Sequence, residues 1–306
     1  MITSIRIYSH PACLQHDTGF GHPESPARLR AVLEALDYPR FANIEWVEAP
    51  RATGEQLLRV HDAAYIESIF ANEGHSLRLD PDTVMSPDSL EAALRAAGAV
   101  CAAVDDVMDG KTQRAFCAVR PPGHHATRDT AMGFCIFNSV AVAAAHALEQ
   151  QGLERATVID FDVHHGNGTQ DIFWNEPRVL YLSSHQMPLY PGTGSRNERG
   201  AGNIVNAPLP PGAGSGEFRA AWDEILLPAL DAHRPQLLLI SAGFDAHRND
   251  PLAQLQLDSD DYAWITQRLC VLAGTHAQGR MVSALEGGYD LGALRECTVA
   301  HVAAMI

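Results

Sequence analysis

Short apolar runs that alternate with helical patterns are the feature of this sequence that most restricts its fold. Four of these runs are each followed by a polar or glycine-rich cluster: Arg114–Val119, Ala156–Phe161, Leu237–Ser241 and Met281–Leu285. Helical patterns occupy Ser89–Met108, Ser139–Glu149, Asp258–Leu272 and Leu291–Ala304. Such alternation is typical of a mainly parallel α/β sheet. Because ligands bind outside the carboxyl ends of strands in such sheets, we expect the four clusters to converge.

Weaker signals complete this outline. Further strands are expected near Ile5–Tyr8 and at Val179–Leu182, and further helices at Pro26–Leu36, at Asp62–Phe70 and near Thr169. The chain has 306 residues, of which 46% are hydrophobic, and no linker rich in serine, proline or charge divides it. We therefore expect one domain over residues 1–306.

Charge and cysteine content exclude several classes of protein. A formal net charge of −15, without a local cluster of Lys and Arg, would repel a phosphate backbone, so no nucleic acid partner is expected. Met1–Ser9 lacks the features of a signal peptide, and no later run is long enough to span a membrane. The six cysteines are scattered and form no C-x-x-C pair, which predicts reduced thiols. Together these features predict a soluble cytoplasmic protein without a membrane partner.

The segment Asp160-Phe-Asp162-Val-His164 predicts a metal site at the end of one strand. In an extended segment, Asp160, Asp162 and His164 would point to one side and the intervening apolar residues to the other. Asp245, which follows the apolar run Leu237–Ile240 through a turn of small residues, is the leading third ligand. Two carboxylates, one imidazole and an open position suit a catalytic zinc ion, although the same set accepts iron, manganese or cobalt.

Two adjacent histidines, His124 and His125, follow a stiff Pro-Pro-Gly turn and could act as a general acid and a general base. Each needs a partner on its far ring nitrogen, and Asp160 and Asn167 are available. A carboxylate partner raises the pKa of a histidine more than an amide does, which would separate the two roles. Tyr289 follows two glycines that would let its phenol swing over the site and stabilise an oxyanion.

These motifs, taken in order, resemble a known family. The matching segments are Arg120-Pro-Pro-Gly-His-His-Ala126, Gly133-Phe-Cys135, Asp160–Gly168, Pro191-Gly-Thr-Gly194, Gly243-Phe-Asp245, Asp250-Pro-Leu252 and Glu286-Gly-Gly-Tyr289. The chain is similar to zinc-dependent histone deacetylases of the arginase/deacetylase superfamily. Asn167 and Leu285-Glu-Gly-Gly-Tyr289 together resemble the class II branch with its bacterial amidohydrolases. The resemblance implies a three-layer α/β arginase/deacetylase fold around a central, mainly parallel eight-stranded sheet.

The resemblance also assigns roles to the site residues. It implies that Asp162, His164 and Asp245 hold one zinc ion, that His125 is the base that activates water, and that Tyr289 polarises the substrate carbonyl. His124 would be the electrostatic and proton-transfer partner. The implied reaction removes acyl groups of the acetyl type from lysine side chains or similar amides, without a covalent enzyme intermediate.

The same resemblance places residues around the substrate and around structural ions. Phe134 and Tyr190 would wall a slot for the acyl-lysine side chain, and Arg28 would belong to a product-release channel. Other residues implied in substrate binding are Gly133, Leu252, Gly288 and, at the rim, Asp82. A potassium ion would lie at Asp160, Asp162, His164, Ser183 and Ser184, and a second near Phe173, Glu176, Val179 and Asn203.

Three alternatives stay open at this point. Hydrolysis of acetylpolyamines is one, although Leu252 stands where polyamine-selective relatives place an acidic residue. A two-manganese ureohydrolase is another, but His165 and His247 occupy positions where it would need carboxylates. A non-catalytic module that binds acyl-lysine would be expected to lack a ligand or the tyrosine, and the sequence has both. The expected partner is thus an acyl-lysine peptide or protein, or a small acylated amine, and a homo-oligomer is compatible with the sequence.

Overall fold

A parallel sheet of eight strands runs through the centre of the computed structural model, which describes residues 5–42 and 44–306. The strand order is β2-β1-β5-β10-β9-β6-β7-β8, and neighbouring strands are parallel throughout. The strands are β1 (Ile5–Ser9), β2 (Glu45–Glu48), β5 (Arg114–Cys117), β6 (Ala156–Asp160), β7 (Val179–Gln186), β8 (Ile204–Leu209), β9 (Leu237–Ala242) and β10 (Met281–Leu285). Residues 1–4 and 43, which the single-domain prediction includes, lie outside the described residues.

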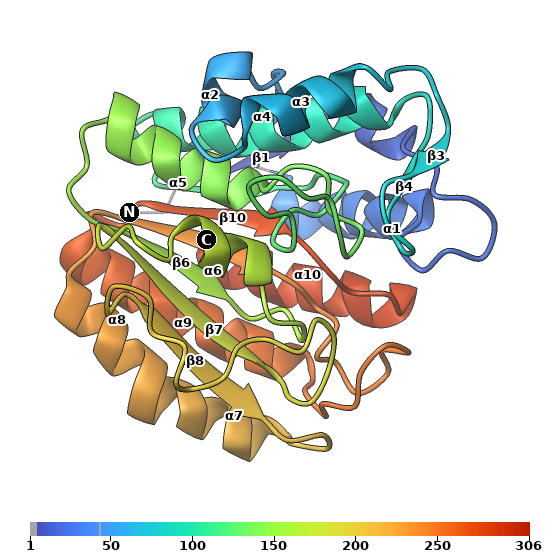
Figure 1. Ribbon diagram of the computed structural model, residues 1–306. Helices are drawn as coiled ribbons and strands as arrows, with labels where there is room; N and C mark the ends of the chain where they lie inside the picture. Colours follow the sequence, from blue (N-terminus) through green and yellow to red (C-terminus); the bar gives the residue numbers. More distant parts are fainter. Residues whose placement is uncertain (1–4, 43) are drawn as a thin grey trace.

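Helices cover both faces of this sheet and complete three layers, which confirms the expected fold (Figure 1). On one face α4 packs against α5, with α2 and α3 beside them. On the other face α9 packs against α10, and α1, α7 and α8 contact this pair. The helices are α1 (Pro26–Leu36), α2 (Gly54–Leu58), α3 (Ala63–Phe70), α4 (Ser89–Met108), α5 (Ser139–Gln150), α6 (Asn167–Ile172), α7 (Ser215–Ala221), α8 (Leu227–His233), α9 (Ser259–His276) and α10 (Leu291–Met305).

Burial explains why the central strands are apolar runs and the edge strands are not. Every residue of β6, β9 and β10 is buried, because helices cover both faces of a parallel sheet. The edge strand β2 exposes glutamates, which discourage pairing with another chain. The opposite edge strand, β8, contains Pro208, a residue tolerated at edges because its missing N–H removes no ladder bond there.

Several elements differ from the sequence-based expectation. The helix at Ser89–Met108 and the strand at Met281–Leu285 agree with the prediction residue for residue. The sequence did not predict β2, β8, α7, α8 or the small antiparallel hairpin of β3 (Leu77–Arg78) and β4 (Val84–Met85). These elements are short or interrupted by polar residues and proline, so their periodicity is weak.

The predicted extended path through His164 is wrong. β6 ends at Asp160, and the chain then turns, with the N–H of Asp162 donating to Oδ1 of Asp160 at 3.2 Å and the N–H of His164 donating to Oδ1 of Asp162 at 2.9 Å. The turn gives these side chains different partners, so that Asp160 contacts His124 through Nδ1 whereas Asp162 and His164 group with Asp245.

The strand order brings the four polar clusters together. β5, β10, β9 and β6 are consecutive neighbours in the sheet, and each carries one cluster after its carboxyl end. Residues far apart in the sequence therefore meet at one edge of the sheet, as the sequence predicts.

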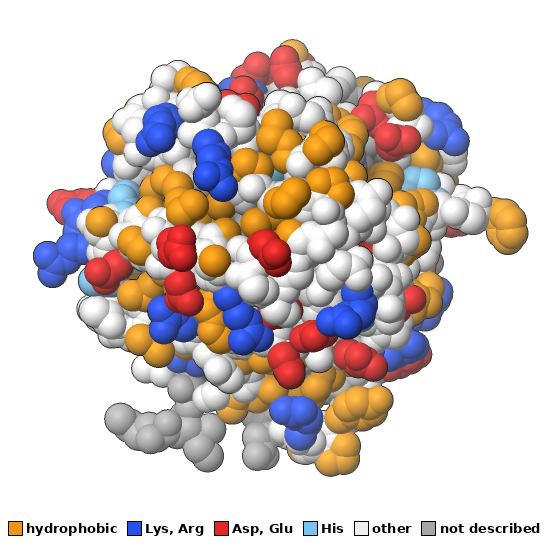
Figure 2. All heavy atoms as spheres, turned by 90° about the horizontal axis from the view of Figure 1, so that it is seen from below, with side chains coloured by type: hydrophobic (Ala, Val, Ile, Leu, Met, Phe, Trp, Pro, Cys, Tyr) orange, Lys and Arg blue, Asp and Glu red, His pale blue; other side chains and the backbone are white. Residues whose placement is uncertain are grey.

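The outer surface mixes charges of both signs. Figure 2 views the molecule from below Figure 1 and shows acidic and basic side chains interspersed among apolar ones. Arg268 on α9, for example, pairs with Asp223 at 2.8 Å. Within residues 5–42 and 44–306, none of the helices has the length and apolar character needed to cross a membrane.

Candidate active site

Three buried side chains converge beyond the ends of β6 and β9. Each of Asp162, His164 and Asp245 offers a ligand atom, and these atoms lie within 4.8 Å of one another. Nδ1 of His164 is 3.1 Å from Oδ1 of Asp162 and 3.1 Å from Oδ2 of Asp245. Two carboxylate oxygens and one imidazole nitrogen fit a divalent transition ion such as zinc.

Backbone donors fix the two carboxylates of this trio. The N–H of Gly287 donates to Oδ2 of Asp162, and the N–H of Val163 donates to Oδ1 of Asp245, each at 2.8 Å. A Cβ atom at position 287 would overlap Oδ2 of Asp245, so glycine is required for this approach. Burial and the charge of Asp162 raise the pKa of Asp245 to about 7. A bound divalent cation would offset this repulsion, which again fits a metal site.

The two adjacent histidines have the different partners that the sequence suggests. Nδ1 of His124 is 3.0 Å from Oδ2 of Asp160, whereas Nδ1 of His125 is 2.8 Å from Oδ1 of Asn167. Because Oδ1 of an amide accepts hydrogen bonds, His125 carries its proton on Nδ1 and leaves Nε2 free to accept one. The imidazole rings lie with their centroids 4.0 Å apart.

Their surroundings also separate the pKa values of these histidines. Burial disfavours the charged form of His124, but the charges of Asp160 and Asp162 outweigh it and raise the pKa of His124 well above its usual value. Burial, followed by the positive charge of His124, lowers the pKa of His125 well below its usual value. The pair therefore combines a protonated imidazole with a neutral one, as general acid and base chemistry requires.

Glu286 positions the histidine pair, a role that the sequence does not predict. Its Oε2 accepts the N–H of Gly123 at 2.6 Å and that of His124 at 3.2 Å. Its Oε1 accepts the hydroxyl of Ser241 at 3.1 Å. One buried carboxyl group thus joins the ends of β5, β9 and β10. The sequence feature that could have identified Glu286 is an acidic residue directly after an apolar strand.

The backbone around Tyr289 is held in place, although its two preceding glycines suggested a mobile phenol. The N–H of Tyr289 donates to Oδ2 of Asp250 at 2.7 Å. Nε of Arg28 donates to the carbonyl of Gly288 at 2.6 Å, and its guanidinium carbon lies 4.8 Å from the centre of the Tyr289 ring. Burial raises the pKa of the phenol well above its usual value, so it stays protonated and can donate a hydrogen bond.

A cavity of about 210 Å³ leads to this group of residues. Phe134 and Tyr190 both line it; the Phe134 ring packs edge-to-face on Tyr289 at 5.9 Å, and the Tyr190 ring on His125 at 5.2 Å. Leu189, which the sequence did not suggest, also lines the cavity. Its lining comprises Asp82, His125, Gly133, Phe134, His164, Leu189, Tyr190, Leu252 and Tyr289.

Two of the expected substrate and product residues lie outside this lining. Gly288 lies next to Phe244 and Leu294, and its φ of 121° suits glycine. Arg28 is fully buried behind Tyr289 and pairs with the buried carboxylate of Glu24 at 3.0 Å. Gly288 precedes Tyr289 in the chain and Arg28 packs against the Tyr289 ring, so both residues adjoin Tyr289 while the cavity walls consist of other residues.

The residues expected around structural potassium ions form two separate groups. Asp160 lies beside Ser183 in the β6–β7 register, with the buried Ser184 next in the chain. The hydroxyl of Ser184 accepts the indole N–H of Trp222 at 3.0 Å. In the second group, Phe173, Glu176 and Val179 turn their backbone carbonyls toward the side chain of Asn203.

Comparisons with known proteins identify the family. The histone deacetylase domain matches residues 22–305. The histone deacetylase-like amidohydrolase of Pseudomonas aeruginosa is 42% identical over 94% of this chain and 78% of its own length. A probable deacetylase of Archaeoglobus fulgidus is 38% identical over all of this chain and 86% of its own length. The crystal structure of the HDA15 HD domain superposes with a TM-score of 0.94 at 34% identity, covering 99% of this chain and 89% of that domain. The chain therefore belongs to the histone deacetylase family of deacetylase-type hydrolases.

Proposed function

We propose that this protein is a zinc-dependent amidohydrolase that removes acetyl-type acyl groups from lysine side chains or from similar amides. One observation carries the proposal: a single cavity is lined by a metal-ligand candidate, His164, a neutral imidazole, His125, and a protonated phenol, Tyr289. A substrate amide that reaches the end of this cavity would meet all three groups at once. The family membership supports the same reaction class.

The metal would be held by Asp162, His164 and Asp245. When bound, a zinc ion would supply Lewis-acid chemistry, that is, polarisation of a carbonyl and acidification of a water molecule. Asp162 and Asp245 are already oriented for this task by the backbone N–H groups of Gly287 and Val163.

The remaining steps belong to the side chains of this chain. Nε2 of His125 accepts a proton from the attacking water, since its Nδ1 is committed to Asn167. Tyr289 donates a hydrogen bond to the carbonyl oxygen as negative charge develops there. The protonated His124, held by Asp160, stabilises that charge, and the histidine pair returns a proton to the departing amine. No side chain forms a bond to the substrate in this scheme.

The walls of the cavity support a substrate with an uncharged stem. Phe134, Leu189, Tyr190 and Leu252 offer mainly apolar surface to a lysine-like chain. Asp82 is exposed at the cavity and is proposed to bind the substrate backbone at the rim. An acetylpolyamine is the second candidate substrate, favoured by the same acidic residue and by the net charge of −15.

Four further proposals concern the whole protein. Residues 1–306 form one catalytic domain, supported by a continuous hydrophobic core among the described residues. One structural potassium ion is held by Asp160, Asp162, His164, Ser183 and Ser184. Arg28 borders a path for product release. The protein is cytoplasmic, in support of which all six cysteines, each within the described part of the chain, are free thiols.

Metal removal and substrate comparison test the proposal. Purified protein is stripped with a chelator and then reconstituted with one equivalent of zinc, and hydrolysis of an acetyl-lysine peptide and of acetylspermidine is followed. We expect activity to return with zinc and the peptide to be the better substrate. Binding of peptide by the zinc-loaded protein without any turnover of either substrate would contradict the proposal and support a binding module instead.

A further inference from the structure

The segment between α6 and β7 builds a ring of backbone carbonyls around one side chain. The carbonyl oxygens of Phe173, Glu176 and Val179 all point at the amide nitrogen of Asn203, at 2.9, 3.0 and 2.8 Å. Asn203 is only 4% exposed and directly precedes β8. We call these three carbonyls the carbonyl ring.

The orientation of this amide follows from its neighbours. Oδ1 of Asn203 accepts the backbone N–H of Ala201 at 3.1 Å, so the oxygen faces a donor and the nitrogen faces acceptors. A flipped amide would place its oxygen against three carbonyl oxygens and its nitrogen against an N–H group. Nδ2 therefore occupies the centre of the carbonyl ring.

These same residues are where the family resemblance implies a second potassium ion. An ion in contact with all three carbonyl oxygens would need the position that Nδ2 of Asn203 fills. The residues therefore do not fit a cation with the side chain in place. We propose that the Asn203 amide replaces the second cation, so that this protein binds a structural monovalent cation at one site only, next to Asp160 and Ser183.

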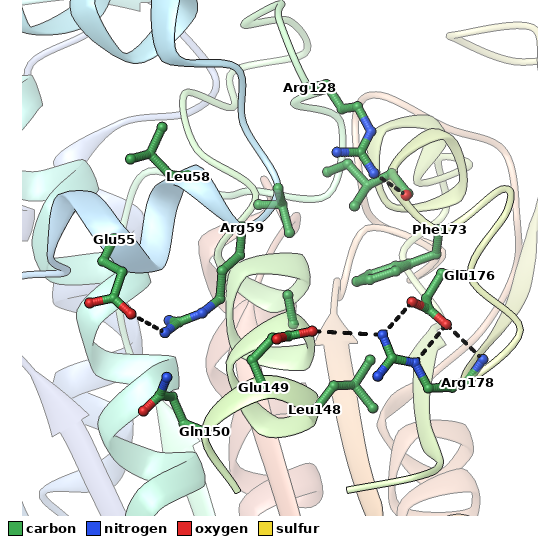
Figure 3. Close-up of a pocket in the computed structure, with 13 residues that line it drawn as sticks. Glu55, Leu58, Arg59, Arg128, Leu148, Glu149, Gln150, Phe173, Glu176 and Arg178 are labelled. Carbon is green, nitrogen blue, oxygen red and sulfur yellow. Dashed lines mark hydrogen bonds and ion pairs between the residues drawn. The ribbon is translucent and has the colours of Figure 1, made fainter. Parts of the chain in front are cut away.

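The charges around the carbonyl ring agree with a neutral occupant. The carboxylate of Glu176 binds Arg178 at 2.6 Å, and Arg178 also lies 3.7 Å from Glu149 (Figure 3). The three groups of the ring are uncharged backbone carbonyls, and the carboxylate of Glu176 is paired with Arg178. A donor with a partial positive charge satisfies such groups without the cost of burying an unpaired charge.

Asn203 connects this ring to the strand beside the candidate site. Its backbone carbonyl accepts the N–H of Tyr181 at 2.9 Å. The hydroxyl of Tyr181 in turn donates to Oδ2 of Asp160, the partner of His124, at 3.0 Å. An internal amide would hold this support in place independently of the salt composition around the protein. The inference concerns the scaffold and does not depend on the proposed reaction.

Thallium(I), a heavy analogue of potassium, tests the inference in crystals of the full chain. We expect an anomalous peak next to Asp160 and Ser183 in the wild-type protein and none inside the carbonyl ring. Asn203→Ala removes the amide, and Asn203→Asp replaces it with a carboxylate that attracts cations. Both variants should gain a peak inside the ring. A wild-type peak there, or the lack of a peak there in both variants, would overturn the proposal.

Thermal unfolding in potassium chloride and in choline chloride gives a second readout that needs no crystals. Potassium should raise the Tm of Asn203→Ala more than that of the wild-type protein. The variant would bind an additional ion in the emptied ring, and a ligand that binds only the folded state stabilises that state. Asn206→Ala is the matched control, since the amide nitrogen of this equally buried residue donates to Oε1 of Gln170, at 2.8 Å. Its potassium response should equal that of the wild type. Equal potassium responses in the wild type and in Asn203→Ala would also overturn the proposal.

Discussion

The carboxylate of Glu286 accepts the backbone N–H of Gly123 at 2.6 Å. Through this bond the end of β10 fixes the turn that presents the histidine pair at the end of β5. Glu286 itself is buried, and burial raises its pKa to about 7. We infer that Glu286 acts as a positioning residue for His124 and His125.

We therefore expect Glu286→Ala to lower both stability and activity. The substitution leaves the buried N–H groups of Gly123 and His124 without an acceptor, which costs about 1–3 kcal/mol for each unsatisfied group. Urea unfolding and kcat/KM measure the two effects. Glu286→Gln retains a carbonyl oxygen that can accept one of these bonds, so it should lose less. Equal losses of stability and of kcat/KM in both variants would show that the oxygen accepting the N–H groups of Gly123 and His124 is not the cause of the effect.

The partner of His125 should set the pH dependence of the reaction. Asn167→Asp places a negative charge 2.8 Å from Nδ1 of His125 and should raise the pKa of this histidine. A higher pKa leaves less neutral base at neutral pH, so the acidic limb of the kcat/KM profile should move to higher pH. Asn167→Ala removes the orienting bond and should cost about 10–100-fold at every pH. An acidic limb that stays in place in Asn167→Asp would contradict the role of His125 as the base.

Gly133 tests how closely the cavity wall approaches His125. A Cβ atom at this position would overlap the imidazole ring, and the φ of 56° also strains any L side chain. Gly133→Ala should displace His125 and lower kcat by about 100-fold, because small displacements of catalytic groups have effects of this size.

Gly110 is the matched control for that substitution. Its φ is 73°, and apart from its chain neighbours no atom of the described residues lies within 4 Å of a Cβ atom added there. Backbone strain in Gly110→Ala should lower the free energy of unfolding by a similar amount, about 1–2 kcal/mol, while kcat stays at the wild-type value. A similar loss of kcat in both variants would assign the effect to backbone strain.

Glu24 should govern part of the acid stability of the protein. Burial opposes ionisation of this residue, but the charge of Arg120 and its hydrogen bonds hold the pKa of Glu24 well below the usual value. The native state therefore gains stability from this carboxylate above the pKa of the unfolded chain, about 4.3, and loses it as the pH falls through the lower native value. Glu24→Gln should cost about 3–5 kcal/mol at pH 7, since it leaves buried arginines without their partner. In urea unfolding, the difference in free energy of unfolding between the wild type and Glu24→Gln should become smaller below pH 4. A difference that stays constant with pH would contradict the stabilising role of the Glu24 carboxylate.

Much of the fold could be predicted because the central strands are buried on both faces and so read as continuous apolar runs. The candidate metal ligands Asp162, His164 and Asp245 and the histidine pair could be predicted for a related reason. Polar residues that directly follow buried parallel strands meet at one edge of the sheet. Glu286 and Leu189 were not predicted as site residues, because their roles depend on contacts with chain segments distant in sequence. The amide of Asn203 could not be placed either, since its three acceptors are backbone carbonyls that any sequence provides. β8 was missed because Asn206 and Pro208 interrupt its apolar pattern.

The most direct test compares the zinc-loaded wild-type protein with Tyr289→Phe and His125→Ala on an acetyl-lysine peptide. Tyr262→Phe is the control, because the hydroxyl of this buried tyrosine has no hydrogen-bond partner in the described part of the chain. We expect kcat to fall by about 100-fold or more in the first two variants, with peptide binding retained, and to stay at the wild-type value in the control. A wild-type rate of deacetylation in either Tyr289→Phe or His125→Ala would contradict the central claim.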